Sequence, residues 1–163
     1  MMMVIASGIT AEVLTPEAGG SVLPRGMRRT GLLDCLIVSG SGARRSRFAA
    51  AAELAGWTEC STPETSAEVG QTIDGDYQLV IVDLAAPLGA RVNDTVELAE
   101  EFAARPGTLL VICGSEDNVD EELWARQLGA WLYLPGVADG DSLTSLCVEA
   151  RRIREGAAFA GVR

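Results

Sequence analysis

The sequence predicts an α/β fold, an open, doubly wound sheet of five parallel strands with helices on both faces. Five short apolar segments alternate along the chain with five segments of helical periodicity, which is the order expected of βα units around a parallel sheet. The apolar segments do not alternate with polar residues, so each strand is expected to be buried on both faces. In such a sheet any site lies beyond the carboxyl ends of the strands.

The first half of this pattern holds three strands and two helices. The expected elements are a strand over 32–39, a helix over 42–56, a strand over 57–61, a helix over 61–73 and a strand over 77–83. The first helix has an apolar face and ends at a glycine, through Phe48, Ala51, Ala52, Ala55 and Gly56. Ser61 is the expected N-cap of the second helix, with Pro63 in its first turn and Glu64 completing a capping box.

The second half holds three helices and two strands. The expected elements are a helix that starts at 93 or 94 and stops before Pro106, a strand over 108–114, a helix over 118–129, a strand over 130–134 and a helix over 141–156. Asn93 or Asp94 is the expected cap of the first of these helices. Helical spacing places two sets of apolar residues inward, Val119, Leu123 and Leu128 in the fourth helix and Leu143, Leu146, Ala150 and Ile153 in the last.

The chain is expected to contain one domain, over residues 31–156, followed by a short C-terminal tail over 157–163. Residues 1–30 are rich in glycine and proline and are interpreted as a flexible arm or as a segment before a true start at Met27. The N-terminus lacks the basic region and long apolar run of a secretory signal, and no window is long enough for a membrane span. These features favour a stand-alone cytoplasmic domain.

Charge and composition argue against several classes of function. The net charge is −10, which disfavours binding to nucleic acid or to an anionic membrane. The chain has no histidine, and all thirteen basic residues are arginine, so no general base near neutral pH can be assigned among the basic side chains. The four cysteines are scattered without a CxxC pair, which favours reduced thiols over a metal site or a disulfide framework. We therefore expect no enzymatic activity, no metal and no cofactor.

One stretch around the third strand carries a resemblance to a known family. A glycine follows the first helix, a tyrosine precedes the third strand, an aspartate ends that strand and a proline follows four residues later; these are Gly56, Tyr77, Asp83 and Pro87. The segment LGAWLYL, residues 128–134, matches the entry to the fifth strand. In this order and spacing, residues 33–155 resemble a response-regulator receiver domain. The resemblance implies the flavodoxin-like strand order 2-1-3-4-5.

The resemblance also implies a phosphoacceptor site that has lost most of its chemistry. Asp83 stands at the phosphoacceptor position, and we expect its carboxylate to be solvated or hydrogen-bonded to loop amides. Ser39 and Gly40 stand where receivers hold Mg²⁺ with two acidic residues, and Mg²⁺ prefers carboxylate oxygens. The remaining positions of this degenerate pocket are Pro87, Cys113 in place of a hydroxyl residue, Ser115 two residues later, and Gly136 in place of a lysine. We interpret the chain as a pseudo-receiver that acts in signal transduction by phosphorylation-independent protein–protein interaction.

Two other functions remain open at this point. In the first, a small-anion sensor, Ser41, Gly42 and Arg44 would bind the anion at the start of a helix; the competing interpretation is that the arginines there are the solvated face of that helix. In the second, Asp83 retains residual phosphoacceptor activity.

The partner is expected to be a protein such as a kinase, a regulator or a second copy of the chain in a homodimer. In receivers the usual partner face combines the fourth helix, the fifth strand and the fifth helix. Trp124, Trp131 and Tyr133 lie on or near that face and are its candidate contact residues.

Overall fold

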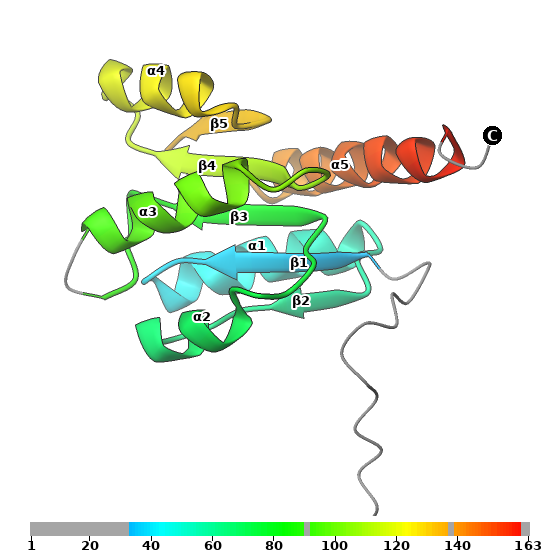
Figure 1. Ribbon diagram of the computed structural model, residues 1–163, viewed down its shortest axis with the longest axis horizontal. Helices are drawn as coiled ribbons and strands as arrows, with labels where there is room; N and C mark the ends of the chain where they lie inside the picture. Colours follow the sequence, from blue (N-terminus) through cyan, green and yellow to red (C-terminus); the bar gives the residue numbers. More distant parts are fainter. Residues whose placement is uncertain (1–32, 90–91, 137–138, 161–163) are drawn as a thin grey trace, which may run out of the picture. The chain divides into compact units, whose positions relative to one another are not determined.

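A computed structural model describes residues 33–89, 92–136 and 139–160 and shows a five-stranded parallel sheet (Figure 1). The strand order is β2-β1-β3-β4-β5. The strands are β1 (Asp34–Val38), β2 (Glu59–Ser61), β3 (Leu79–Asp83), β4 (Leu109–Gly114) and β5 (Leu132–Pro135). The fold class and the strand order predicted from the sequence are therefore confirmed.

Within the described ranges, five helices cover the two faces of this sheet (Figure 1). They are α1 (Gly42–Leu54), α2 (Ser66–Thr72), α3 (Val92–Ala103), α4 (Val119–Leu128) and α5 (Gly140–Ala160). Phe48 of α1 and Leu143 of α5 belong to one buried cluster, and Phe102 of α3 and Ala125 of α4 belong to the other. The strands separate these clusters because successive side chains of a strand point to opposite faces.

The register of the central strands places the candidate site. Val38 pairs with Val82 across β1 and β3, and Asp83 pairs with Cys113 across β3 and β4. The strands are parallel, so the loops after β1, β3, β4 and β5 all leave the sheet at the same edge. We call this the carboxyl edge.

The second helix begins later than the sequence pattern indicated. Ser61 is the last residue of β2, and Pro63 is buried outside the helix. Thr65 is the N-cap, because its side chain accepts a hydrogen bond from the Glu68 amide at 3.2 Å. The Glu68 carboxylate in turn accepts one from the Glu64 amide at 2.8 Å. The expected capping chemistry is present, but strand pairing keeps residues 59–61 extended and moves it along by four residues.

The third and fifth helices also differ from expectation at their ends. Asn93 and Asp94 lie inside α3, which starts at Val92, so neither is its cap. The last helix continues to Ala160, so the tail expected from residue 157 is helical over its first part. The expectations for residues 1–30 fall outside the described ranges.

The fourth helix presents a face to the core that differs in part from the prediction: Leu128 packs inward as expected, but Val119 and Leu123 do not. Val119 and Leu123 are 75% and 53% exposed, whereas Ala125 is fully buried, and Trp124 and Leu128 pack against the same cluster. Two apolar residues are consequently left on the surface.

Candidate functional site

Asp83 ends β3 at the carboxyl edge, and its side chain has no exposed surface. Its Oδ2 accepts a hydrogen bond from the Ser39 hydroxyl at 2.6 Å, and its Oδ1 accepts one from the Ala86 amide at 3.3 Å. Burial of a carboxylate is costly unless an opposite charge and hydrogen bonds compensate. The two bonds from neutral donors do not supply that charge.

Arg44 supplies the charge through a two-point ion pair with Asp83. Its Nε lies 2.6 Å from Oδ2 and its Nη2 lies 2.8 Å from Oδ1. This two-point contact between a guanidinium and a carboxylate is a strong, charge-assisted form of hydrogen bonding. With four donors directed at it, the Asp83 carboxylate accepts bonds on both oxygens, which is the pattern of the ionised form.

The first turn of α1 positions this arginine. Ser41 is the N-cap, and its hydroxyl accepts a hydrogen bond from the Arg44 amide at 3.4 Å. The cap fixes the start of the helix, so residue 44 is held one turn above the end of β1. From there the guanidinium reaches across to the neighbouring strand β3.

The loop after β1 packs directly on the loop after β3. The Gly40 amide donates a hydrogen bond to the Ala86 carbonyl at 2.6 Å. A Cβ atom at position 40 would collide with the Pro87 carbonyl oxygen. Within the loop after β1, Arg45 donates a hydrogen bond to the Ser39 carbonyl at 2.8 Å. Glycine is therefore required at position 40 by the close approach of the two loops.

The other residues of the predicted pocket, at the ends of β4 and β5, make contacts of their own. Cys113 is buried opposite Asp83, where burial, followed by the nearby Asp83 carboxylate, raises the pKa of its thiol. Ser115 is exposed, and its amide donates to the Glu121 carboxylate at 3.0 Å. Gly136 has a φ of +71° and donates to the Gly114 carbonyl at 2.9 Å.

The interpretation of the arginines at the start of α1 as solvated is wrong for two of them. The side chains of Arg44 and Arg45 are only 17% and 13% exposed. Of the two environments expected for the Asp83 carboxylate, the structure shows the second: it is buried and accepts a hydrogen bond from one loop amide. The guanidinium of Arg44 already binds the Asp83 carboxylate, so an external anion would have to compete with Asp83 for it. The hypothesis of an anion site at Ser41, Gly42 and Arg44 stays a prediction.

Sequence reasoning missed the Arg44–Asp83 pair, although a signal for it was present. A carboxylate at the end of a buried strand needs a counter-charge, and the acidic neighbours expected after β1 are replaced by Ser39 and Gly40. Once those carboxylates are absent, an arginine in the first turn of the next helix is the nearest cation that the topology offers. The residue was identified, but as a ligand for an external anion.

The residues at this edge do not fit the Mg²⁺ ion that the receiver resemblance implies. Ser39 and Gly40 contribute no carboxylate, and both oxygens of Asp83 are held by Arg44. Mg²⁺ needs octahedral oxygen ligands at short range, and a guanidinium in contact with the same carboxylate repels it. Over the described ranges, no group of three or more Asp, Glu, Cys or His residues is arranged to hold a metal ion.

The candidate partner face exposes apolar side chains, but they are not the three aromatic residues that the sequence suggested. Trp124, Trp131 and Tyr133 are each half-buried and pack against the core. The Tyr133 hydroxyl donates to the Glu121 carboxylate at 2.9 Å, and burial together with this bond raises the pKa of Tyr133. The more exposed apolar side chains on α4 and β5 are Val119, Leu123 and Leu132.

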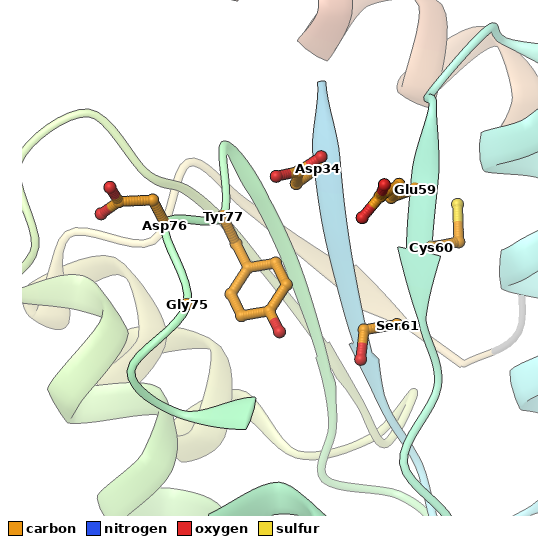
Figure 2. A pocket seen from close by; sticks show the side chains of 7 residues that line it. All are labelled: Asp34, Glu59, Cys60, Ser61, Gly75, Asp76 and Tyr77. Atoms are coloured by element: carbon orange, nitrogen blue, oxygen red, sulfur yellow. The ribbon is translucent and has the colours of Figure 1, made fainter. Parts of the chain in front are cut away.

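A cavity of about 480 Å³ lies at the opposite, amino edge of the sheet (Figure 2). It is lined by Asp34, Glu59, Cys60, Ser61, Gly75, Asp76 and Tyr77. Asp34 begins β1, residues 59–61 form the short edge strand β2, and residues 75–77 precede β3, whereas Asp83 lies at the far end of β3. Sequence reasoning did not identify this edge as a site.

Of the helices in the described ranges, none is both long enough and apolar enough to cross a lipid bilayer.

Comparison with known proteins gives matches in structure only. No family model matches the chain, and no curated protein matches it in sequence. Among solved structures, the chain is similar to a CheY-like response regulator receiver domain protein from Methanospirillum hungatei JF-1, with a TM-score of 0.63 and 20% identity over 77% of this chain and 98% of that one.

Two further structures extend the comparison. A response regulator from Thermotoga maritima has a TM-score of 0.60 and 16% identity over 73% of this chain and 97% of that one. An orphan response regulator of H. pylori has a TM-score of 0.57 and 14% identity over 75% of this chain and 95% of that one. At these identities the likeness concerns the fold, and the chain has the fold of the CheY-like receiver domains.

Proposed function

We propose that this chain is a cytoplasmic pseudo-receiver that acts in signal transduction by binding a protein partner independently of phosphorylation. The observation that carries the proposal is the two-point ion pair between Arg44 and Asp83. It places a permanent positive charge where a receiver would recruit a metal ion and a phosphoryl group.

Phosphoryl transfer to Asp83 would require the carboxylate to be free and accessible. Catalysis of this transfer rests on positioning and on positive charge around the transferring oxygens. Here the carboxylate has no exposed surface, and each of its oxygens accepts a bond from Arg44. A phosphodonor would have to displace a buried charged bond before attack, in a site that contributes no second carboxylate for a metal.

The ion pair also favours a single conformational state. In a switchable domain the negative charge at this edge is compensated differently before and after modification. An arginine that belongs to the chain compensates it at all times. Signalling by such a domain would depend on its abundance and on its binding to a partner protein, and not on the attachment of a phosphoryl group.

The surface of α4 and β5 supports a protein partner. Val119 and Leu123 are separated by one helical turn, and Leu132 lies on the adjacent edge strand β5. Acidic residues surround the start of α4, at Asp120, Glu121 and Glu122. Exposed apolar side chains with a polar rim are the usual composition of a protein interface.

Co-purification of proteins from cells that express the chain tests this function. The bait variants are the wild type, Asp83→Asn, Leu123→Asp on α4, and Leu54→Asp as a matched control on α1, where Leu54 is 79% exposed. We expect one partner, or the chain itself, to be retained by the wild type, Asp83→Asn and Leu54→Asp and lost with Leu123→Asp, with no change on adding a phosphodonor and Mg²⁺. Retention that depends on the phosphodonor, or that survives Leu123→Asp, would contradict the proposal.

A further inference from the structure

Two of the four cysteines lie side by side across β1 and β2. Cys35 and Cys60 are direct partners in the parallel register of these strands. Paired residues of neighbouring strands are about 4.8 Å apart, within the range of about 4.4–6.8 Å that a disulfide spans between Cα atoms. Both side chains also pack in the same cluster, beneath α1 and α5. The backbone therefore already holds the two residues at bonding separation.

The two thiols lie in unequal environments. Cys35 has no exposed surface, whereas Cys60 is half-buried on the edge strand β2. Figure 2 shows the Cys60 side chain pointing away from Glu59 and Ser61, which lie on the cavity side of β2. An oxidant arriving from solvent therefore meets Cys60 first, with Cys35 directly behind it.

The hydrogen bond between the thiols favours ionisation of the outer one. A side-chain bond from Cys35 lowers the pKa of Cys60, against the opposing effects of partial burial and the Glu53 carboxylate. The same bond, with burial, raises the pKa of Cys35. Burial raises the pKa of Cys147 to about 12. A partly exposed thiol with a lowered pKa and a second thiol next to it is the arrangement found at oxidant-sensitive cysteines.

We propose that Cys60 and Cys35 form a reversible oxidant-sensitive pair, in which a hydroperoxide oxidises Cys60 and Cys35 then closes a disulfide between β2 and β1. In the first step the Cys60 thiolate attacks the terminal peroxide oxygen, the O–O bond breaks, and a sulfenic acid forms while hydroxide leaves from hydrogen peroxide, or an alkoxide from an organic hydroperoxide. In the second step the Cys35 sulfur attacks the sulfenic sulfur, and one water molecule leaves with the Cys35 proton. The peroxide is reduced by two electrons and the two thiols are oxidised to one disulfide.

The disulfide would join the three-residue edge strand β2 to the centre of the sheet. Its Cys60 sulfur remains partly accessible, so an external thiol can reduce it, as is typical of exposed and labile disulfides. The pair lies on the opposite edge of the sheet from Asp83. Its chemistry is thus independent of the function proposed above.

Peptide mass spectrometry after mild oxidation tests the pair. The reduced protein is treated with hydrogen peroxide, its remaining thiols are blocked by alkylation, and the digest is analysed. We expect linked peptides that contain Cys35 and Cys60, two hydrogen atoms lighter than the free pair, and their loss on treatment with dithiothreitol. Cys147→Ala should give the same linkage as the wild type, while Cys60→Ser should give none.

Two further measurements keep the test independent of how the variants fold. In the untreated native wild type, Cys60 should be alkylated at least about tenfold faster than Cys113 and Cys147, because thiolate fraction and access control the rate. In Cys35→Ala, dimedone should trap a sulfenic acid at Cys60, because its partner is absent. The proposal is overturned if Cys60 is alkylated no faster than the buried thiols, or if oxidised Cys60 is found linked to any residue other than Cys35 of the same chain.

Discussion

At the residue scale, the character of the site depends on which cation faces Asp83. The carboxylate is buried and accepts hydrogen bonds from Ser39, Arg44 and the Ala86 amide. Arginine differs from a metal ion or a lysine here because it is covalently part of α1, stays protonated and binds in two places at once. If Asp83 were phosphorylated, the loops after β1 and β3, which are already in contact, would have to make room for the phosphoryl group as well as for the Arg44 side chain.

The first prediction concerns the energy of this pair. Arg44→Met should lower the free energy of unfolding by about 3 kcal/mol, because it leaves the Asp83 charge buried without a partner. Arg44→Met combined with Asp83→Leu should recover most of that loss, since no buried charge remains. Urea denaturation at neutral pH measures both.

Arg152→Met is the matched control for this measurement. Arg152 forms a pair with Glu149 in which the side chains are 71% and 58% exposed, so its loss should change stability by less than about 1 kcal/mol. If Arg44→Met costs no more than Arg152→Met, the Arg44–Asp83 pair does not hold the carboxyl edge together.

At the element scale, glycine is required in the loop after β1 but not in the helix α2. Gly40 lies against the Pro87 carbonyl, whereas Gly70, inside α2, has no atom within 4 Å of the place a Cβ would occupy. Gly40→Ala should therefore lower stability by about 1–3 kcal/mol through overpacking. Gly70→Ala should raise it by about 0.5–1 kcal/mol, because alanine loses less conformational entropy in a helix.

Thermal or urea unfolding of these two variants measures the difference. Equal effects of the two substitutions would show that the loops after β1 and β3 are not in the close contact described for Gly40 and Ala86.

The elements also show where sequence patterns were sufficient and where they were not. Continuous apolar segments predicted the three central strands β1, β3 and β4, because strands buried on both faces leave little choice of residue. The edge strands β2 and β5 were also predicted, but they are only partly buried, so the expectation that every strand is covered on both faces was wrong for them. The start of α2 was wrong because a Ser-x-x-Glu pattern at 61–64 and a Thr-x-x-Glu pattern at 65–68 are equally good capping boxes locally. Only the pairing of β2 with β1 decides between them. The buried face of α4 was wrong for a similar reason, since Ala125 carries too weak an apolar signal to compete with Val119 and Leu123.

At the scale of the whole molecule, alternating strands and helices fixed the topology and so brought Ser39, Asp83 and Cys113 to one edge. The carboxyl edge could therefore be predicted as the place of the candidate site. The Arg44–Asp83 pair could not be, because its formation depends on the reach of a side chain from α1 to β3 rather than on any local pattern. The Cys35–Cys60 contact was missed for the same reason: it follows from register, and the spacing of the two residues in the chain carries no sign of it.

The molecule as a whole has a receiver fold in which an arginine of the chain itself, Arg44, neutralises the charge of Asp83. An edge of this kind should not respond to the ligands that switch a phosphorylated receiver. Two of the three tryptophans are placed to report such a response, because Trp124 lies on α4 and Trp131 immediately precedes β5.

The most direct measurement is the tryptophan fluorescence and the size-exclusion elution of the wild type and Asp83→Asn with Mg²⁺ and beryllofluoride, a mimic of aspartyl phosphate. A phosphorylatable receiver domain treated in parallel confirms that the reagent is active. The account predicts no saturable change in fluorescence or elution for either form of this protein. A saturable change in the wild type that is absent from Asp83→Asn would contradict it and would show that Asp83 still accepts a phosphoryl group.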